Sequence, residues 1–219
     1  MTHDHSEVVI LTKAPHPGRV KTRLAPALGL EGAAALHRLF VDHTLSLVAA
    51  SGLPVTVAVG ADPDDAFAGQ LRARGLAVVP QATGDLGARM RALIAGSSRR
   101  RVLIGTDCPL FAPAWLVQAV QAPQTVAIAP SEDGGYWAIS VDPCAPSSVL
   151  DALFDQMTWS TPQVLSTTLS RLSRLGVPAG LLPTAWDIDE PKDLVRLLRD
   201  PRCPAILRSH LSHLPTPPC

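Results

Sequence analysis

Four cations gather around the end of the first apolar segment of the chain. Residues 7–13 read EVVILTK, and the following loop, APHPGRVKTRL, places Arg19, Lys21 and Arg23 at alternate positions. An extended loop would direct these three side chains to one side, where Lys13 adds a fourth charge. Because guanidinium groups offer paired donors that match phosphate oxygens, the pattern favours a phosphate- or pyrophosphate-binding loop. A solvated basic loop is the alternative.

A carboxylate follows a second apolar segment. Residues 102–104 form a continuous apolar run, typical of a strand buried on both faces of a parallel sheet, and Asp107 comes next within GTDCP. Ligands of open α/β sheets bind outside the carboxyl ends of the strands, so Asp107 is a candidate for catalysis. It is also a candidate ligand for Mg²⁺ or Mn²⁺, which prefer oxygen atoms. Asp107 could instead only turn the chain before Pro109.

Two further acids lie two residues apart in the segment WDIDEP. Asp187 and Asp189 would share one side of an extended chain, and either could supply a second carboxylate to the metal ion. Asp189 is also the expected N-cap of a helix that starts near Glu190. Asp187 has no such alternative role.

The segment SEDGGYW has the composition of a substrate pocket. The carboxylates of Glu132 and Asp133 could orient or deprotonate an acceptor, glycine permits close approach, and the rings of Tyr136 and Trp137 could stack on a ligand. Asp133-Gly134 is also a hairpin turn signal, which could explain the whole segment.

A glycine-bounded turn, TGDLGARM, precedes another expected helix. The backbone amides of Gly84, Asp85 and Gly87 could contact the base or ribose of a nucleotide at the helix N-terminus. Asp85 can equally serve only as the N-cap of that helix.

The elements that must position these residues alternate between strand and helix. Apolar runs predict strands over residues 7–13, 54–60, 76–79, 102–104, 125–130 and 138–141. Helices are expected over residues 30–50, 62–74, 113–121 and 160–175, and from about residues 86 and 190. This alternation predicts a three-layer α/β/α fold with a mostly parallel sheet. We expect one domain over residues 1–200 and a loose, proline-rich tail over 201–219.

Composition excludes several classes of function. Of the 219 residues, 19 are Lys or Arg and 19 are Asp or Glu, so no general attraction to nucleic acid or anionic membranes is expected. We expect neither a signal peptide nor a transmembrane helix. The four cysteines form no C-x-x-C pair and are typical of reduced thiols in a cytoplasmic protein.

The motifs TKAPHPGRVKTRL, GDLGARM, IGTDCP, EDGGYW, WST and DIDEPKDL, taken in this order, resemble a bacterial family of nucleotide-diphospho-sugar transferase-like proteins with the GT-A fold. Members of that family are labelled glycosyltransferases. The resemblance spans about Val8 to Leu198. The same order is similar, more distantly, to 2-phospholactate guanylyltransferase. The chain departs from the sugar-nucleotide pyrophosphorylases, because it lacks their L-x-x-G-x-G-x-R-M loop, and it has no D-x-D around Asp107.

The resemblance implies roles for the candidate residues. The basic loop would hold the phosphates of the donor, the turn at residues 84–87 would lie near the nucleotide, and Asp107 would bind the divalent metal with Asp187 or Asp189. Glu132 and Asp133 would face the acceptor.

Two reactions fit these implied roles. The leading expectation is glycosyl transfer from a nucleotide sugar to a small-molecule acceptor. The alternative is nucleotidyl transfer, in which a nucleoside triphosphate condenses with a small phosphorylated or hydroxylated substrate and pyrophosphate leaves. A non-catalytic nucleotide-binding domain is a third possibility, against which the intact acids argue.

Overall fold

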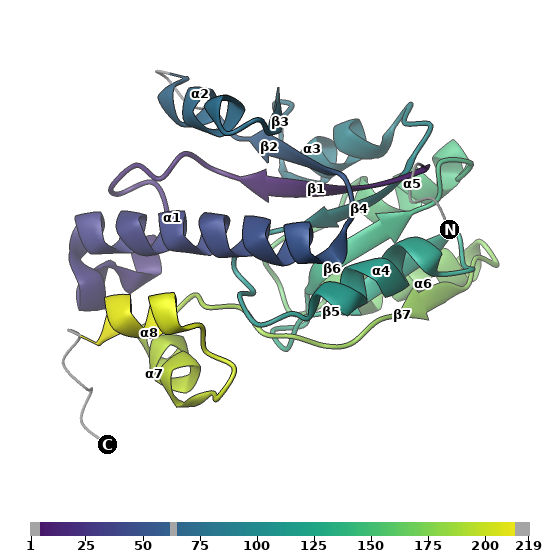
Figure 1. The fold of residues 1–219 in the computed structure, drawn as a ribbon. Coiled ribbons are helices and arrows are strands. Elements are labelled where there is room, and N and C mark those ends of the chain that lie inside the picture. The colour runs from purple at the N-terminus through teal and green to yellow at the C-terminus, as the bar shows by residue number, and fades with distance from the viewer. Residues whose placement is uncertain (1–4, 62–64, 213–219) are drawn as a thin grey trace.

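A seven-stranded sheet forms the centre of the part of the chain that the structure, a computed structural model, describes, namely residues 5–61 and 65–212. The strand order is β3-β2-β1-β4-β6-β5-β7, and only β6 runs antiparallel to its neighbours (Figure 1). The strands are β1 (Ser6–Thr12), β2 (Val55–Val59), β3 (Ala77–Pro80), β4 (Arg100–Ile104), β5 (Val126–Pro130), β6 (Tyr136–Val141) and β7 (Ala179–Leu181).

Helices cover both faces of this sheet. They are η2 (Thr22–Leu24, a 3-10 turn), α1 (Ala25–Ser51), α2 (Ala66–Ala73), α3 (Leu86–Ile94), α4 (Pro113–Gln121), α5 (Ser147–Phe154), α6 (Val164–Arg174), α7 (Pro191–Arg199) and α8 (Ala205–Leu211). Helices α1, α2 and α4 pack on one face, and α3, α5 and α6 pack on the other. The predicted three-layer α/β/α fold is therefore confirmed. None of the described helices combines the length and hydropathy that a membrane span requires.

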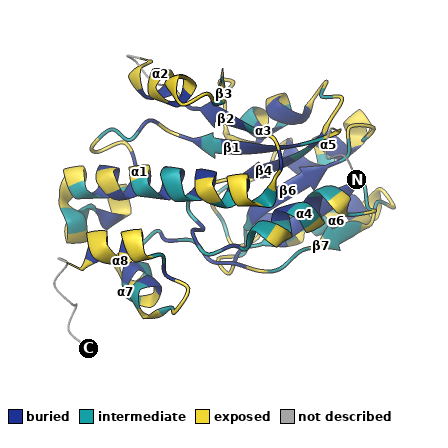
Figure 2. Ribbon diagram, viewed as in Figure 1, coloured by how far each residue is buried: buried dark blue, intermediate teal, exposed yellow. Residues whose placement is uncertain are grey.

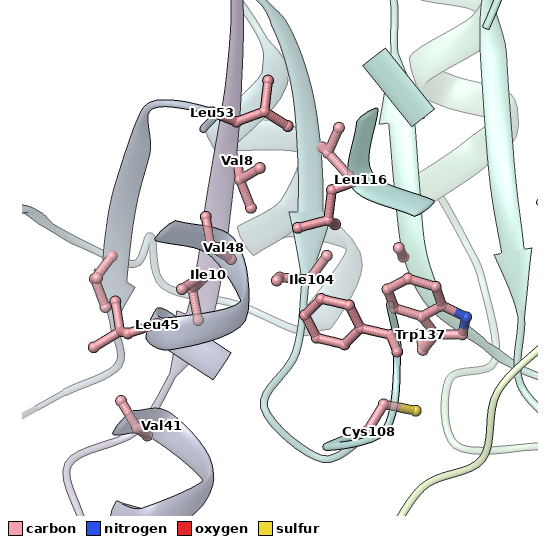
Figure 3. Packing of buried hydrophobic residues seen from close by; sticks show 14 of the residues in the cluster. Val8, Ile10, Val41, Leu45, Val48, Leu53, Ile104, Cys108, Leu116 and Trp137 are labelled. Carbon is pink, nitrogen blue, oxygen red and sulfur yellow. The ribbon is translucent and has the colours of Figure 1, made fainter. Parts of the chain in front are cut away.

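The continuous apolar runs reflect burial on both sides. In β1, Val8 and Ile10 belong to the core beneath α1, whereas Val9 belongs to the core on the opposite face. Figure 3 shows the first of these cores, in which Val8 and Ile10 lie beside Val48 of α1. Figure 2 shows the same arrangement as dark strands between helices that are buried only on their inner sides.

The segment around Asp133-Gly134 forms a hairpin. Strands β5 and β6 pair antiparallel, and the turn is closed by a 3.1 Å hydrogen bond from the Gly134 amide to the Ser131 carbonyl. Gly134 has a φ of +88°, which favours glycine, and the space beside its Cα is filled by the Pro162 carbonyl. The hairpin interpretation is thus confirmed, and the turn is docked on residues 160–162.

The sequence placed two helix starts incorrectly. Helix α6 begins at Val164, because Ser160 adopts a left-handed φ of +60° and lies before it. The N-cap of α7 is Glu190, which forms a reciprocal capping box with Asp193, so the expectation that Asp189 would be the N-cap is wrong. The predicted start of a helix at Asp62 and Pro63 lies outside the described residues.

The proline-rich segment from residue 201 is not uniformly loose. Its helix α8 buries Leu207 and Leu211 in a third core with α7 and the beginning of α1, and Figure 1 shows α7 and α8 beside that end of α1. The tail expectation is wrong for residues 201–212, where buried leucines hold the helix. Residues 213–219 lie outside the described part.

Candidate active site

A cleft of about 740 Å³ opens where β1 and β4 end. The basic loop, the loop after β4, helix α3, the β5–β6 hairpin and the segment at residues 187–189 all contribute to its lining. This is the carboxyl edge of the parallel strands, at which open α/β sheets bind their ligands. Most of the residues predicted to do chemistry therefore meet around one cavity.

Lys21 lies between two of the predicted metal ligands. Its ammonium group is 2.7 Å from Oδ1 of Asp107 and 2.9 Å from Oδ1 of Asp189, and it donates to the carbonyl oxygen of Ile188 at 2.6 Å. Burial alone lowers the pKa of Lys21, but the two carboxylates outweigh it and raise the pKa above its ordinary value. Lys21 is thus directed toward acids, whereas the sequence pattern predicted that it would face phosphate.

Asp187 has a different environment from the other two acids. Its Oδ1 accepts a hydrogen bond from the Cys108 thiol at 3.1 Å, and its Oδ2 accepts one from the Ser131 hydroxyl. Burial raises the pKa of Asp187, although these hydrogen bonds oppose the rise and the charge of Asp107 adds to it. Burial also raises the pKa of the Cys108 thiol, which keeps it protonated as a donor. Asp187 therefore joins the loop after β4 to the hairpin.

Three cations of the predicted phosphate loop remain exposed. Lys13, Arg19 and Arg23 line the cleft and make no ion pair within the described ranges. Arg89 of α3 is a fourth cation on the cleft wall, and its Nε donates to the Gly84 carbonyl at 3.0 Å. Sequence reasoning did not select Arg89, although the motif that contains it was recognised. These side chains are available to an anionic ligand.

The two acids of the hairpin point to different places. Glu132 makes a two-pronged ion pair with Arg196 at 2.6 and 2.8 Å, and the Arg196 guanidinium lies 4.1 Å from the centroid of the Trp186 ring. The hydrogen bonds from Arg196 lower the pKa of Glu132. Asp133 lines the cleft, where one carboxylate oxygen accepts from the Gly135 amide at 2.9 Å. The structure thus brings only Asp133 to the cavity.

The glycine-bounded turn before α3 is occupied by local structure. Asp85 is the N-cap of α3 and accepts from the Ala88 amide at 2.8 Å, and Gly84 adopts a φ of +104°. Gly87 is buried, and a Cβ there would lie 2.5 Å from the Phe154 carbonyl. Gly87 is therefore needed for helix packing, and none of the three residues is part of the cleft lining.

Two polar residues of the cleft were not selected from the sequence. Gln81 donates to the carbonyls of Thr12 at 2.9 Å and Ala58 at 2.8 Å, so it joins the ends of β1 and β2. His37 of α1 is buried, its Nε2 lies 3.1 Å from the Lys13 carbonyl, and its Nδ1 is buried with no partner. Both residues stabilise the strand ends from which the basic loop departs.

A divalent metal ion, which the resemblance implies, fits the carboxylates at the cleft. The side chains of Asp107 and Asp189 are 46% and 45% exposed, and Lys21 contacts Oδ1 of each. No group of three or more His, Cys, Asp or Glu side chains forms a metal site within residues 5–61 and 65–212. The donor set is therefore of the kind that Mg²⁺ and Mn²⁺ use when substrate phosphates and water complete their coordination.

Solved structures of transferases share this fold. One from Desulfovibrio desulfuricans G20, provisionally described as a nucleotide-diphospho-sugar transferase, is 26% identical, covers 97% of this chain and 96% of its own, and has a TM-score of 0.82. The inositol-1-phosphate CTP transferase from T. maritima is 14% identical over 98% of this chain and 99% of its own, with a TM-score of 0.58. A manganese complex of Rv0371c from Mycobacterium tuberculosis H37Rv is 17% identical over 88% and 97%, with a TM-score of 0.52.

These likenesses confirm the predicted GT-A, nucleotide-diphospho-sugar transferase type of fold, and the two more distant ones concern the fold alone. No curated protein matches the sequence. A family model matches residues 44–161, more than half of the chain. The protein belongs to the family described as "Uncharacterized protein conserved in bacteria (DUF2064)".

Proposed function

We propose that the protein is a divalent-metal-dependent transferase that takes a nucleotide-diphospho-sugar as donor and passes the sugar to a small acceptor. The observation that carries this proposal is the separation of charge across the cleft. Lys13, Arg19 and Arg23 are exposed without carboxylate partners, whereas the half-exposed acids Asp107 and Asp189 lie at the same cavity. The similar structure from Desulfovibrio desulfuricans, described as a sugar transferase, supports the choice of donor.

The exposed cations would bind the diphosphate of the donor. Guanidinium groups offer paired donors to phosphate oxygens, and they would stabilise the charge that develops on the leaving nucleotide. Arg89 would extend this positive surface along α3. Asp107 and Asp189 would hold Mg²⁺ or Mn²⁺, which would neutralise the leaving diphosphate. The manganese complex among the similar folds is consistent with such a site.

Asp133 is the candidate general base for the acceptor. It lines the cleft at the hairpin, whereas both oxygens of Glu132 are engaged by Arg196 outside the cavity. A carboxylate at that place could take a proton from an acceptor hydroxyl as the new bond forms. Glu132 would act through Arg196, which packs on Trp186 next to the acidic segment.

Nucleotidyl transfer is the second candidate. A triphosphate carries more charge than the diphosphate of a nucleotide sugar, and the cations that line the cleft suit the larger charge. The same cations would then stabilise the pyrophosphate as it leaves while a phosphate or hydroxyl of the second substrate attacks the α-phosphorus.

A thermal-shift screen separates the candidates. The melting temperature would be measured with panels of nucleotide sugars and nucleoside triphosphates, each with and without Mn²⁺, because a ligand at 100 times its Kd stabilises by about 2.7 kcal/mol. The leading proposal requires a Mn²⁺-dependent shift with a nucleotide sugar and release of a nucleoside diphosphate on turnover. Release of pyrophosphate from a triphosphate would establish the second candidate. No Mn²⁺-dependent shift with either panel would refute both.

A further inference from the structure

We propose that Lys21 is a built-in counter-ion of the acid pair, which prevents Asp107 and Asp189 from retaining a free divalent ion, so that the metal enters only together with the donor phosphates. The inference rests on the proposed function, because it concerns the same carboxylates. It assigns to Lys21 a role that differs from phosphate binding. It also predicts an order of binding that the fold alone does not imply.

The contacts of Lys21 leave its ammonium group with no free donor. An ammonium carries three N–H groups, and three acceptors surround this one: Asp107 at 2.7 Å, Asp189 at 2.9 Å and the Ile188 carbonyl at 2.6 Å. The side chain is only 5% exposed, and the nitrogen lies 5.6 Å from the centroid of the Phe40 ring. A phosphate could reach Lys21 only after several of these contacts were broken.

The backbone directs Lys21 away from its neighbouring cations. Lys21 has a φ of +46° and a ψ of +37°, a left-handed conformation that non-glycine residues rarely adopt. The buried side chains of Val20 and Leu24 anchor the loop on either side of it. Because this turn reverses the expected alternation, Arg19 and Arg23 stay exposed while Lys21 enters the acid pair. Such strain persists only where surrounding contacts enforce it.

The charge balance explains why a free ion would be disfavoured. Two carboxylates present two negative charges to the cleft, and the ammonium between them cancels one. A divalent ion on the outer oxygens would lie a few ångströms from that ammonium, which repels it. Donor phosphates supply both additional oxygen ligands and the missing negative charge. The phosphates therefore make metal binding favourable without displacing Lys21.

The test measures Mn²⁺ binding directly, without turnover. Water-proton relaxation, which rises when Mn²⁺ is immobilised on a protein, would be recorded during Mn²⁺ titrations with and without pyrophosphate. The proteins are the wild type, Lys21→Gln, Lys21→Met and the control Lys13→Gln. Lys13 carries the same charge and lines the same cleft but makes no carboxylate contact among the described residues. Circular dichroism melts identify which variants are folded.

The expected wild type binds Mn²⁺ weakly alone and much more tightly with pyrophosphate. Lys21→Gln, which keeps a hydrogen-bond donor but no charge, should bind Mn²⁺ alone about tenfold more tightly or better, because a like charge has been removed at short range. Lys13→Gln should resemble the wild type in Mn²⁺ alone. Lys21→Met serves if the glutamine variant does not fold, and the wild-type titrations need no variant.

Two results would overturn the inference while leaving the proposed function intact. One is a wild type that binds Mn²⁺ alone as tightly as it does with pyrophosphate. The other is a folded Lys21 variant whose affinity for Mn²⁺ alone is unchanged. A wild type that retains no Mn²⁺ even with pyrophosphate would instead contradict the proposed metal-dependent function, and the inference with it.

Discussion

The backbone amide of Ile188 donates a 2.9 Å hydrogen bond to the carbonyl oxygen of Asp107. This contact joins the loop after β4 to the segment before α7, and Lys21 then binds the carboxylates of Asp107 and Asp189 from below the same contact. The two acids are therefore placed by the main chain as well as by their side chains. A change of the Asp107 side chain alone should leave the loop in position.

Asp107→Asn tests whether this carboxylate serves the reaction. The substitution keeps the size of the side chain and the backbone bond to Ile188 but removes the charge, so metal-dependent nucleotide binding and turnover should fall sharply. Thermal shifts with Mn²⁺ and nucleotide, followed by turnover assays, give the measurement. Asp42→Asn is the control, since Asp42 is a surface acid paired with Arg74. Full Mn²⁺-dependent activity in folded Asp107→Asn would refute the assignment.

Arg19→Ala together with Arg23→Ala tests the phosphate role of the basic loop. Each charge-assisted hydrogen bond contributes about 1.5 to 3 kcal/mol, so nucleotide affinity should fall by at least about tenfold. Stability should change little, because both side chains are exposed. Isothermal titration with the best nucleotide of the thermal screen measures the effect. Arg174→Ala, an exposed residue at the end of α6, should bind as the wild type does. Equal affinity of the double variant and this control would exclude the role.

A matched pair of amide substitutions separates the hairpin acids. Asp133→Asn should reduce turnover by roughly 10²- to 10⁴-fold with donor affinity retained, if Asp133 is the general base. Glu132→Gln should reduce turnover less, because Glu132 lies outside the cleft and contacts Arg196. Steady-state kinetics with a donor titration distinguish kcat from KM. Loss of donor binding in Asp133→Asn would place that acid in the nucleotide site instead.

The sequence predicted the sheet well because its signals are local. The continuous apolar runs of β1 and β4 follow from burial between two helical layers, and that pattern is read within a few residues. The edge at which Asp107 lies follows from strand direction alone. The hairpin at Asp133-Gly134 was likewise available from a dipeptide with a known turn preference.

The directions of the charged side chains were not available in the same way. The alternation of Arg19, Lys21 and Arg23 assumed an extended loop, whereas the left-handed turn at Lys21 sends its side chain inward. Glu132 is withdrawn from the cleft by Arg196, a partner from α7 that only the tertiary fold brings near. Local pattern gives the residue types at a site, but the pairing of charges depends on contacts between distant segments.

Leu207→Ala tests whether α8 is an integral part of the fold. Leu207 is fully buried against α7 and the beginning of α1, so truncation should reduce the free energy of unfolding by about 2 to 5 kcal/mol. Ile206 is 58% exposed on the same helix, and Ile206→Ala should change stability by about 0.5 kcal/mol or less. Urea denaturation of both variants gives the comparison. Equal stabilities would mean that the proline-rich segment is dispensable.

His37→Gln tests a pH dependence that originates beside the basic loop. Burial lowers the pKa of His37 below its ordinary value of 6.5, and this outweighs the hydrogen bond to the Lys13 carbonyl, which raises it. The folded state therefore binds a proton on His37 less readily than the unfolded chain does. The resulting stability is fully present above pH 6.5 and is lost as the pH falls from there toward the lower pKa of the folded state. The wild type should lose more unfolding free energy between pH 7.5 and about pH 5.5 than His37→Gln, which has no imidazole to titrate at this position. Urea denaturation at both pH values measures the two losses, and His43, whose pKa burial also lowers, is common to both proteins. If the two proteins lose the same free energy on acidification, His37 is not a source of the acid sensitivity.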